Sequence, residues 1–491
     1  MSNTVLEQMD IDPADLDNQL FIPSYPLDPF LWLDSRKLDQ LTDEIAGEID
    51  RVKPPGKKRS KDAQEKFLFS IKVLLLNLAR LSRLSKKIWL GVSLRPAAYT
   101  QDRYGHPLLS FRIFKTAVYD AMLDLELIEV AKKGWYSQAK GKGETTRIEA
   151  APALLERLKA VLPQEIIIFQ RHPMEETIKL REAKEDGRKM IDYTDTDYTN
   201  TARDRLRRIN ACLQRHWYDL DMSEIQFRDL AERLIQRHDV DPTEHPAVDF
   251  SARSLYRIFN NGSFDEGGRF YGGWWMGIPS EYRRYLTINQ KRTVEVDFSN
   301  LHPKMMYAQK GLSLEGDAYA VDGIERALVK KAFAQLINGK KQVRPPTGYD
   351  PKEMGMTWKE VLAQVEKRHA PISEFFRTGY GLKLQRVDAD IAERVLLYFA
   401  ERNIPCLPIH DSFIVHHDLQ DELKDRMLLE YREELGFDPG FKVDDNYLFY
   451  VEHNPGSGEV NMQSIEDILA AESQSQYERR WRCWLEQCTR G

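Results

Sequence analysis

Two stretches decide the fold, TVEVDFSNLHP (residues 293–303) and NIPCLPIHDSFIVHHD (residues 403–418). In the first, apolar residues alternate ahead of Asp297, which predicts a short strand that ends on a carboxylate and turns into a helix. In the second, two strand-like runs flank His410-Asp411, which predicts a hairpin with an aspartate at its tip. Each feature alone is more often structural, as a cap or a turn. A buried carboxylate at a strand end is costly unless it is paired or binds a metal.

Taken together, the two aspartates predict a metal site. Asp297 and Asp411 on neighbouring strands can hold two Mg²⁺ ions, with Mn²⁺ as an alternative. One ion lowers the pKa of an attacking hydroxyl, and the other stabilises the leaving oxygens. Because Mg²⁺ takes further ligands from water and substrate phosphates, two carboxylates suffice.

A helix is predicted from Ile324 to Ile337, within GIERALVKKAFAQLINGKK. Arg326 and Lys330 are four residues apart and share one helical face. A guanidinium fork and a point charge on one face suit a triphosphate, although an ordinary basic surface helix is the alternative. The pair Asn338-Gly339 is expected to end the helix.

A third stretch, FDEGGRFYGGWW (residues 264–275), places two glycines ahead of Arg269. Such glycines allow close approach of the backbone to a ligand. Tyr271, Trp274 and Trp275 could stack on bases or fill a core.

Taken in chain order, these elements resemble the superfamily that joins family A DNA polymerases, of the bacterial polymerase I type, to phage-type single-subunit RNA polymerases. The resemblance covers roughly residues 260–450 and implies an α+β right-hand fold, with a palm, small fingers and a helical thumb. It implies that Asp297 binds both metals, that Phe298 next to it belongs to the same metal site, and that Asp411 completes the site. Arg326 and Lys330 would grip the nucleotide phosphates, Lys330 as a catalytic cation.

The resemblance also assigns contacts to the nucleic acid. Arg269 would contact the template–primer duplex, and His410 would lie beside it. Gln385, in LQRVDADIAERVL, looks like the family's glutamine that reads the minor groove near the primer end. Arg326 and Lys330 match the Arg-xxx-Lys of the family's motif B, which has a tyrosine eight residues after the lysine. Here that residue is Asn338, which puts sugar selection and placement of the templating base in doubt.

The product of the reaction is indicated by the residue five positions after Asp297. Family A enzymes place a sugar gate there, and here it is His302, whose ring would clash with a 2′-hydroxyl. This favours a DNA-directed DNA polymerase, and without a convincing exonuclease motif we expect no proofreading. Ser412, together with the DxxGR motif that Asp265 to Arg269 match, favours an RNA polymerase or primase instead. A template-independent nucleotidyltransferase and a non-catalytic DNA-binding initiator or regulator with a degenerate palm are further alternatives.

The N-terminal part predicts a second nucleic-acid site. Between Arg51 and Leu90 there are 12 Lys/Arg and 2 Asp/Glu, which is either a binding surface or a solvated tail with a helix face. A helix Phe111–Asp124 followed by strands at 127–130 and 145–149 looks like a winged helix-turn-helix, with a generic helix–hairpin unit as the alternative. The predicted phosphate contacts on the wing are Lys132, Lys133, Lys140 and Lys142.

Composition sets the remaining bounds. The chain has 491 residues, 42% of them apolar and 30% charged, a net charge of −6, and no apolar run long enough to cross a bilayer. None of the four cysteines forms a CxxC pair, so we expect a cytoplasmic protein. We also expect it to be nucleoid-associated and to be encoded by a bacterium or a mobile element. Its expected partners are a DNA template–primer duplex and nucleoside triphosphates, with no membrane.

Five segments are predicted. They are an acidic arm and basic linker (1–62), a winged-helix-like domain (63–160), a helical connector or thumb (161–258), palm and fingers (259–455), and a linker with a C-terminal helix (456–491).

Overall fold

The computed structural model describes residues 23–84, 86–100, 102–137, 142–164, 166–240, 247–340, 344–445 and 477–488, and it is a mixed α+β structure. The chain divides into two compact units. Unit 1 comprises Met1–Glu175, Glu224–Ser251 and Arg482–Gly491, and unit 2 comprises Glu176–Ser223 and Ala252–Trp481.

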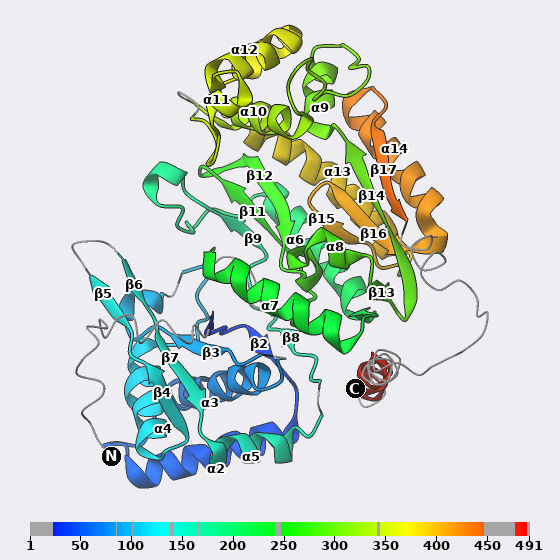
Figure 1. Cartoon of the computed structure of the whole chain (residues 1–491). Coiled ribbons are helices and arrows are strands. Elements are labelled where there is room, and N and C mark those ends of the chain that lie inside the picture. The colour runs from blue at the N-terminus through cyan, green and yellow to red at the C-terminus, as the bar shows by residue number, and fades with distance from the viewer. Residues whose placement is uncertain are drawn as a thin grey trace, which may run out of the picture. The chain divides into compact units, whose positions relative to one another are not determined.

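Unit 1 combines helices with a small sheet (Figure 1). The sheet has the strand order β1-β3-β7-β4, and two separate ribbons pair β2 with β8 and β5 with β6. Its strands are β1 (Ser24–Pro26), β2 (Leu31–Trp32), β3 (Trp89–Val92), β4 (Ile128–Lys132), β5 (Trp135–Ser137), β6 (Lys142–Glu144), β7 (Thr146–Ala150) and β8 (Gln170–Arg171). Its helices are α2 (Arg36–Val52), α3 (Lys61–Leu81), the short 3-10 helix η3 (Pro96–Ala98), the π-helix η4 (Ile113–Tyr119), α4 (Asp120–Asp124), α5 (Pro152–Val161) and α7 (Glu224–Val240).

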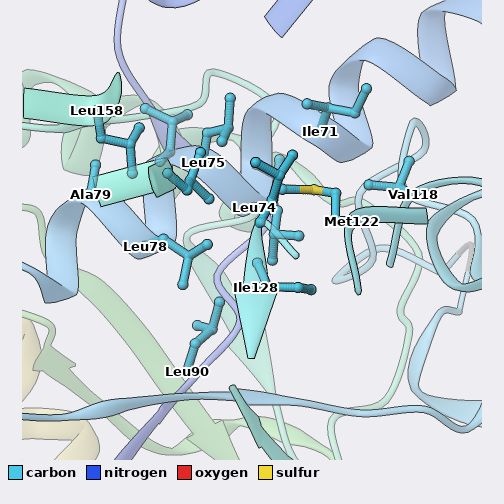
Figure 2. Close-up of a cluster of buried hydrophobic side chains, with 14 of the residues drawn as sticks. Ile71, Leu74, Leu75, Leu78, Ala79, Leu90, Val118, Met122, Ile128 and Leu158 are labelled. Carbon is cyan, nitrogen blue, oxygen red and sulfur yellow. The ribbon is translucent and has the colours of Figure 1, made fainter. Parts of the chain in front are cut away.

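The core of unit 1 forms around α3. Ser60 caps this helix by accepting a hydrogen bond from the backbone N–H of Ala63. Figure 2 shows the cluster that α3 makes with other elements. The labelled side chains are Ile71, Leu74, Leu75, Leu78 and Ala79 of α3, with Leu90, Val118, Met122, Ile128 and Leu158. Because α3 is buried on most of its circumference, it is the central helix of this unit.

Helix α2 belongs to the same core. Its apolar positions Leu38, Leu41, Ile45 and Ile49 recur at helical spacing and are all buried in this cluster. Part of the segment that the sequence suggested to be an arm, residues 36–52, is therefore a core helix, whereas residues 53–60 connect α2 to α3.

The helix and ribbon predicted in unit 1 are present. Residues 111–124 are helical throughout, with a π-helical middle. The strands β4 and β7 pair antiparallel, and β7 also pairs with β3. The ribbon β5–β6 extends from them.

Unit 2 contains two sheets (Figure 1). The larger has the order β10-β13-β14-β16-β15, and β17 also pairs with β14. The smaller has the order β12-β11-β9. The strands are β9 (Ile178–Leu180), β10 (Tyr218–Leu220), β11 (Tyr256–Asn260), β12 (Ser263–Tyr271), β13 (Leu286–Ile288), β14 (Lys291–Ser299), β15 (Leu407–Ile409), β16 (Ser412–His416) and β17 (Gly440–Asp445).

The helices of unit 2 cover these sheets. They are α6 (Asp197–Gln214), α8 (Ser280–Arg283), α9 (Leu301–Gln309), α10 (Arg326–Asn338), α11 (Pro351–Met354), α12 (Trp358–Arg368), α13 (Gly381–Glu401) and α14 (Gln420–Leu435), with the 3-10 turns η5 (Lys184–Asp186), η6 (Trp274–Gly277), η7 (Ala370–Phe375) and η8 (His417–Leu419). The 21-residue α13 packs against β12, α6 and α14, so it links the two sheets. Helix α14 packs against β14, the strand that carries Asp297.

The predicted helical connector, residues 161–258, contains α6 and α7 but is divided between the units. Residues 477–488 form the described part of the C-terminal helix. In unit 2, the hydroxyl of Tyr477 lies 3.0 Å from that of Thr287, and Arg480 pairs with the buried Asp219.

None of the helices in the described part of the chain is long and apolar enough to cross a membrane. Within the described part of the chain, none of the cysteines Cys212, Cys406, Cys483 and Cys488 forms a disulfide.

Candidate active site

Strand pairing brings the two predicted aspartates together. β14 and β16 are antiparallel, and Asp297 lies opposite Ser412, the neighbour of Asp411. The backbone N–H of Phe298 points to the carbonyl of Asp411 at 3.4 Å. The juxtaposition predicted from the sequence is therefore present.

The hairpin tip has an uncommon backbone. Ile409 and Ser412 pair directly, so His410 and Asp411 form a two-residue turn. His410 has a φ of 57°, in the left-handed region that few residues other than glycine adopt. Hairpins of this kind favour glycine at such positions, and backbone strain of this sort clusters at functional sites.

Asp297 carries an uncompensated charge. Its Oδ1 atom is buried and has no hydrogen-bond partner. Burial, followed by the charges of Asp411 and Glu295, raises the pKa of Asp297 to about 7, although Lys442 and Lys330 act in the opposite direction. Ionising this carboxyl beside a second one is costly, and a bound cation would relieve that cost.

The neighbouring carboxylate of Glu295 has a different role. It accepts hydrogen bonds from Arg283 at 2.8 and 3.0 Å and from the hydroxyl of Ser412 at 2.7 Å. Ser412 therefore ties the hairpin to β14 through Glu295. This leaves Asp297 and Asp411 as the carboxylates that could bind a ligand.

These two carboxylates could hold a metal whose other ligands come from water and phosphate. Within the ranges given above, no group of three or more His, Cys, Asp or Glu side chains is arranged to bind a metal. The side chain of Phe298, which the sequence placed at the metal site, is buried against Tyr431 and Phe441 at ring distances of 5.7 and 5.8 Å. It fills the core beside β14, and only its backbone could serve the site.

Helix α10 presents the predicted cation pair. Arg326 forms an ion pair with Asp317 at 2.6 and 3.1 Å. Lys330 is exposed, and no acidic side chain in the described ranges pairs with it. Because Lys330 influences the pKa of Asp297, it lies on the side of the aspartate pair.

Helix α10 ends where the sequence predicted, at Asn338 with Gly339 as its C-cap. Gly339 has a φ of −78°, so the chain leaves the helix on extended backbone and not through a left-handed turn. The Nδ2 atom of Asn338 donates to the carbonyl of Ala334 at 2.8 Å. A Cβ on Gly381, at the start of α13, would lie 1.9 Å from Oδ1 of Asn338, so this glycine permits the close approach of the two helices.

Tyr319 is a site residue that the sequence did not reveal. Its ring lies 5.3 Å from the guanidinium of Arg326 and 6.0 Å from Nζ of Lys330. Burial raises the pKa of Tyr319 to about 12, against Arg326 and with the help of Asp411. Tyr319 therefore lies beside both α10 cations, and nothing in its local sequence indicates this.

Arg269 and His302 meet at a third residue, Asp388 of α13. Nε of Arg269 donates to both oxygens of Asp388 at 3.1 Å, and its Nη2 also donates to Oδ2. Nε2 of His302 lies 2.9 Å from Oδ2 of Asp388 and 3.3 Å from Nη2 of Arg269. The structure thus joins two predicted site residues through a carboxylate that no motif indicated.

The remaining predicted contacts lie near this group. Gln385 is half-buried on α13, three residues before Asp388 and hence on the same side of the helix. His410 lies edge-on to Tyr271, with ring centroids 6.0 Å apart.

The two tryptophans after Arg269 are core residues, and the two glycines before it shape the backbone. Trp274 and Trp275 are buried, and Nε1 of Trp275 donates to the carbonyl of Pro408 at 3.1 Å, so both fill the core. The two glycines before Arg269 serve the backbone. Gly267 and Gly268 have φ values of 79° and 82°, at an irregularity in the β11–β12 pairing.

The basic stretch of unit 1 is partly paired. Five of its side chains form ion pairs with Asp50, Asp39, Asp249, Glu232 and Glu149: Arg59, Lys72, Arg80, Lys86 and Lys87. These five side chains contribute to the stability of unit 1, and the role of the stretch as a binding surface or as a solvated tail with a helix face stays a prediction.

The wing keeps part of its predicted charge. Lys132 lies 3.4 Å from Glu144, whereas Lys133 is exposed. Lys140 lies outside the described residues, and so does the side chain of Lys142.

No protein-family model and no curated protein matches the chain. Among the solved structures that match is the POL domain of Pol1 from M. smegmatis, in complex with DNA primer-template and dNTP. It is 14% identical, with a TM-score of 0.30, and the match covers 84% of this chain and 66%, just under two thirds, of that chain.

Proposed function

We propose that this protein is a metal-dependent nucleotidyltransferase that extends a DNA primer on a DNA template. The observation that carries the proposal is the pair Asp297 and Asp411. They meet on adjacent strands, one of them has a buried oxygen without a partner, and burial with mutual repulsion raises the pKa of Asp297 to about 7. The order of the motifs along the chain, which resembles that of family A polymerases, supports the same function.

The site residues divide the work of phosphoryl transfer. Asp297 and Asp411 would hold two Mg²⁺ ions, with the backbone at Phe298 beside them. Such ions activate the primer 3′-hydroxyl and neutralise the oxygens of the leaving pyrophosphate. Lys330, which has no acidic partner within the described residues, is the first cation available to the phosphates.

Two residues must rearrange before they bind a nucleotide. Arg326 would exchange Asp317 for a phosphate, which is favourable because a phosphate presents the same bidentate geometry. Asn338 would release the carbonyl of Ala334 if its side chain contacts the nucleotide. Arg269, Gln385 and His410 would bind the duplex.

Unit 1 would bind the DNA. The sheet order β3-β7-β4 after the helix at 111–124 resembles a winged helix-turn-helix, and Lys132 and Lys133 would contact phosphates together with Lys140 and Lys142. Trp135 and Tyr136 of the ribbon, 50% and 46% exposed, provide aromatic faces beside these lysines.

The test is extension of a labelled DNA primer on a DNA template with Mg²⁺, with dNTPs and NTPs in parallel. Asp411→Ala should lower extension by about 1,000-fold, because several kcal/mol of metal-dependent stabilisation are lost. Asp418→Ala is the matched control, since this carboxylate follows the same hairpin but is 78% exposed. It should extend like the wild type.

The outcomes separate the candidate functions. Use of dNTPs that depends on Asp411 supports the proposal. Extension with NTPs alone would make the protein an RNA polymerase or primase, and addition without a template would make it a terminal transferase. No incorporation, with duplex binding intact, would overturn the proposal in favour of a binding protein with a disused palm.

A further inference from the structure

Asp388 is a buried carboxylate that holds the predicted nucleotide contact and the predicted duplex contact at once. It projects from α13, with its side chain only 1% exposed. Its two partners come from distant parts of the chain, Arg269 from β12 and His302 from the first turn of α9. A buried charge with two such partners restrains both, because the loss of either would leave part of the buried charge uncompensated.

The contacts of His302 determine which of its ring nitrogens carries a proton. Nε2 lies 2.9 Å from a carboxylate oxygen, which can only accept a hydrogen bond. Nε2 must therefore be protonated and donate to Asp388. Nη2 of Arg269, 3.3 Å away, is itself a donor and cannot share that proton, so it directs its hydrogens to Asp388.

The other ring nitrogen is consequently an acceptor in the neutral imidazole. If Nε2 carries the proton, Nδ1 has a lone pair. No group in the described ranges bonds to Nδ1 of His302, whose side chain is 20% exposed. His302 is also the residue that stands five positions after Asp297, where the resemblance to family A polymerases implies a contact with the sugar of the nucleotide.

We propose that Asp388 is a positioning residue that locks His302 in the Nε2–H tautomer, so that Nδ1 accepts a hydrogen bond from a sugar hydroxyl of the incoming nucleotide. This inference rests on the proposed function and adds a chemical basis for substrate choice. The bulk of the ring excludes some sugars, whereas the acceptor at Nδ1 favours binding of a sugar whose hydroxyl can donate a hydrogen bond to it.

The same carboxylate orients Arg269. The Nε and Nη2 groups of Arg269 are directed to Asp388, and Nη1 has no partner within the described residues. Although burial acts in the opposite direction, Asp388 and then Asp411 raise the pKa of Arg269, so the guanidinium stays charged. Nη1 is thus the donor left for the primer–template duplex.

The test compares Asp388→Asn with Asp390→Asn. Asp390 lies two residues further along α13 and pairs with Arg257 at 3.1 Å and with Arg386, but it does not contact His302. We would measure kcat/KM for a dNTP, the matching 2′,3′-dideoxynucleotide and the matching NTP. The dideoxynucleotide reports a contact with the 3′-hydroxyl, and the NTP reports one with the 2′-hydroxyl.

For a 3′-hydroxyl contact, Asp388→Asn should reduce the preference for dNTP over dideoxynucleotide by roughly 3- to 10-fold, the value of one hydrogen bond. For a 2′-hydroxyl contact, the ratio of NTP to dNTP use should fall by a similar factor. Asp390→Asn should change neither ratio. If Asp388 only neutralises Arg269, both ratios stay constant while overall efficiency falls, and the inference is overturned.

Two further measurements keep the inference testable if Asp388→Asn folds poorly. His302→Phe retains the bulk of a ring without an acceptor, so it should lose the same hydroxyl preference. Nitrogen NMR of the wild-type protein, which needs no turnover, should show His302 protonated at Nε2 and not at Nδ1. The opposite tautomer would overturn the inference even in an active polymerase. An inactive wild type with the Nε2–H signal would overturn the proposed function and the sugar contact, but not the hold of Asp388 on His302.

Discussion

The basic stretch of unit 1 and the acidic hairpin of unit 2 look equally suggestive in the sequence, yet the structure treats their charges differently. In unit 1, Arg80 is buried but pairs with Asp249 at 2.5 Å. In unit 2, Asp297 has a buried oxygen with no partner, and its pKa is raised to about 7 by burial and by nearby carboxylates. A compensated charge stabilises the fold, whereas an uncompensated one indicates a ligand that is not part of the chain.

The same contrast holds within α10, and it gives the largest expected effect. Lys330→Ala should lower kcat for single-nucleotide incorporation by roughly 100- to 1,000-fold, as expected for one cation that stabilises transition-state charge. Arg326→Ala should have a smaller effect, because Asp317 already engages this exposed guanidinium. Pre-steady-state kinetics would measure both, and the reverse order would contradict the assignment of Lys330 as the primary cation.

A compensated charge should matter for stability and not for chemistry. Arg80→Ala should destabilise unit 1 by about 3 kcal/mol, because it leaves Asp249 buried and unpaired. Lys66→Ala breaks an exposed pair with Asp62 and should cost less than about 1 kcal/mol. Urea unfolding of both variants tests this, and equal destabilisation would contradict the contrast between the two regions.

The carboxylate of Asp297, which has no compensating partner, should lower the stability of the protein, whereas the paired Arg80 raises it. Because the pKa of Asp297 is about 7 in the folded protein and 3.8 for an ordinary carboxyl, the folded state binds the extra proton. Without metal, stability should therefore fall as pH rises from about 4 to about 7. Asp297→Asn should remove this loss and stabilise the protein at pH 8 by about 2 kcal/mol, allowing for solvent screening.

Thermal unfolding in metal-free buffer between pH 5 and pH 8 measures this effect. Mg²⁺ should raise the Tm of the wild type at pH 8 and leave that of Asp297→Asn almost unchanged. A stability difference between the wild type and Asp297→Asn that does not change over this range would rule out the repulsion at Asp297.

The smallest expected effect concerns the wing. Lys133→Ala should reduce the slope of log affinity for duplex DNA against log salt by about 0.9, the share of one phosphate contact. Lys159→Ala, on α5 of the same unit and paired with Glu156 at 2.9 Å, is the matched control and should leave the slope unchanged. Fluorescence anisotropy at several salt concentrations would show whether the two lysines differ.

Local sequence patterns were sufficient to predict an element where apolar residues recur periodically or where a polar turn separates two apolar runs. The alternation before Asp297, the apolar period of residues 111–124 and the polar tip at His410-Asp411 each predicted an element that the structure contains. The end of α10 at Asn338-Gly339 was also predicted correctly, although Gly339 adopts extended backbone and not the left-handed conformation common at such ends. Helix α2 was not predicted as a core helix, because its many acidic residues made the segment resemble a peripheral arm although its apolar residues recur at helical spacing.

The sequence by itself determined the two carboxylate-bearing strand ends, the helical face that carries Arg326 and Lys330, and the helix and ribbon of unit 1, since each depends on residues close together in the chain. The tertiary structure alone decided which charges are compensated. Asp388 meets Arg269 and His302, and Arg80 meets Asp249, across separations of 86 to 169 residues. Such partners are chosen by packing, because burying a charge is tolerated only where the fold supplies its counterpart, and no local pattern records where that counterpart lies.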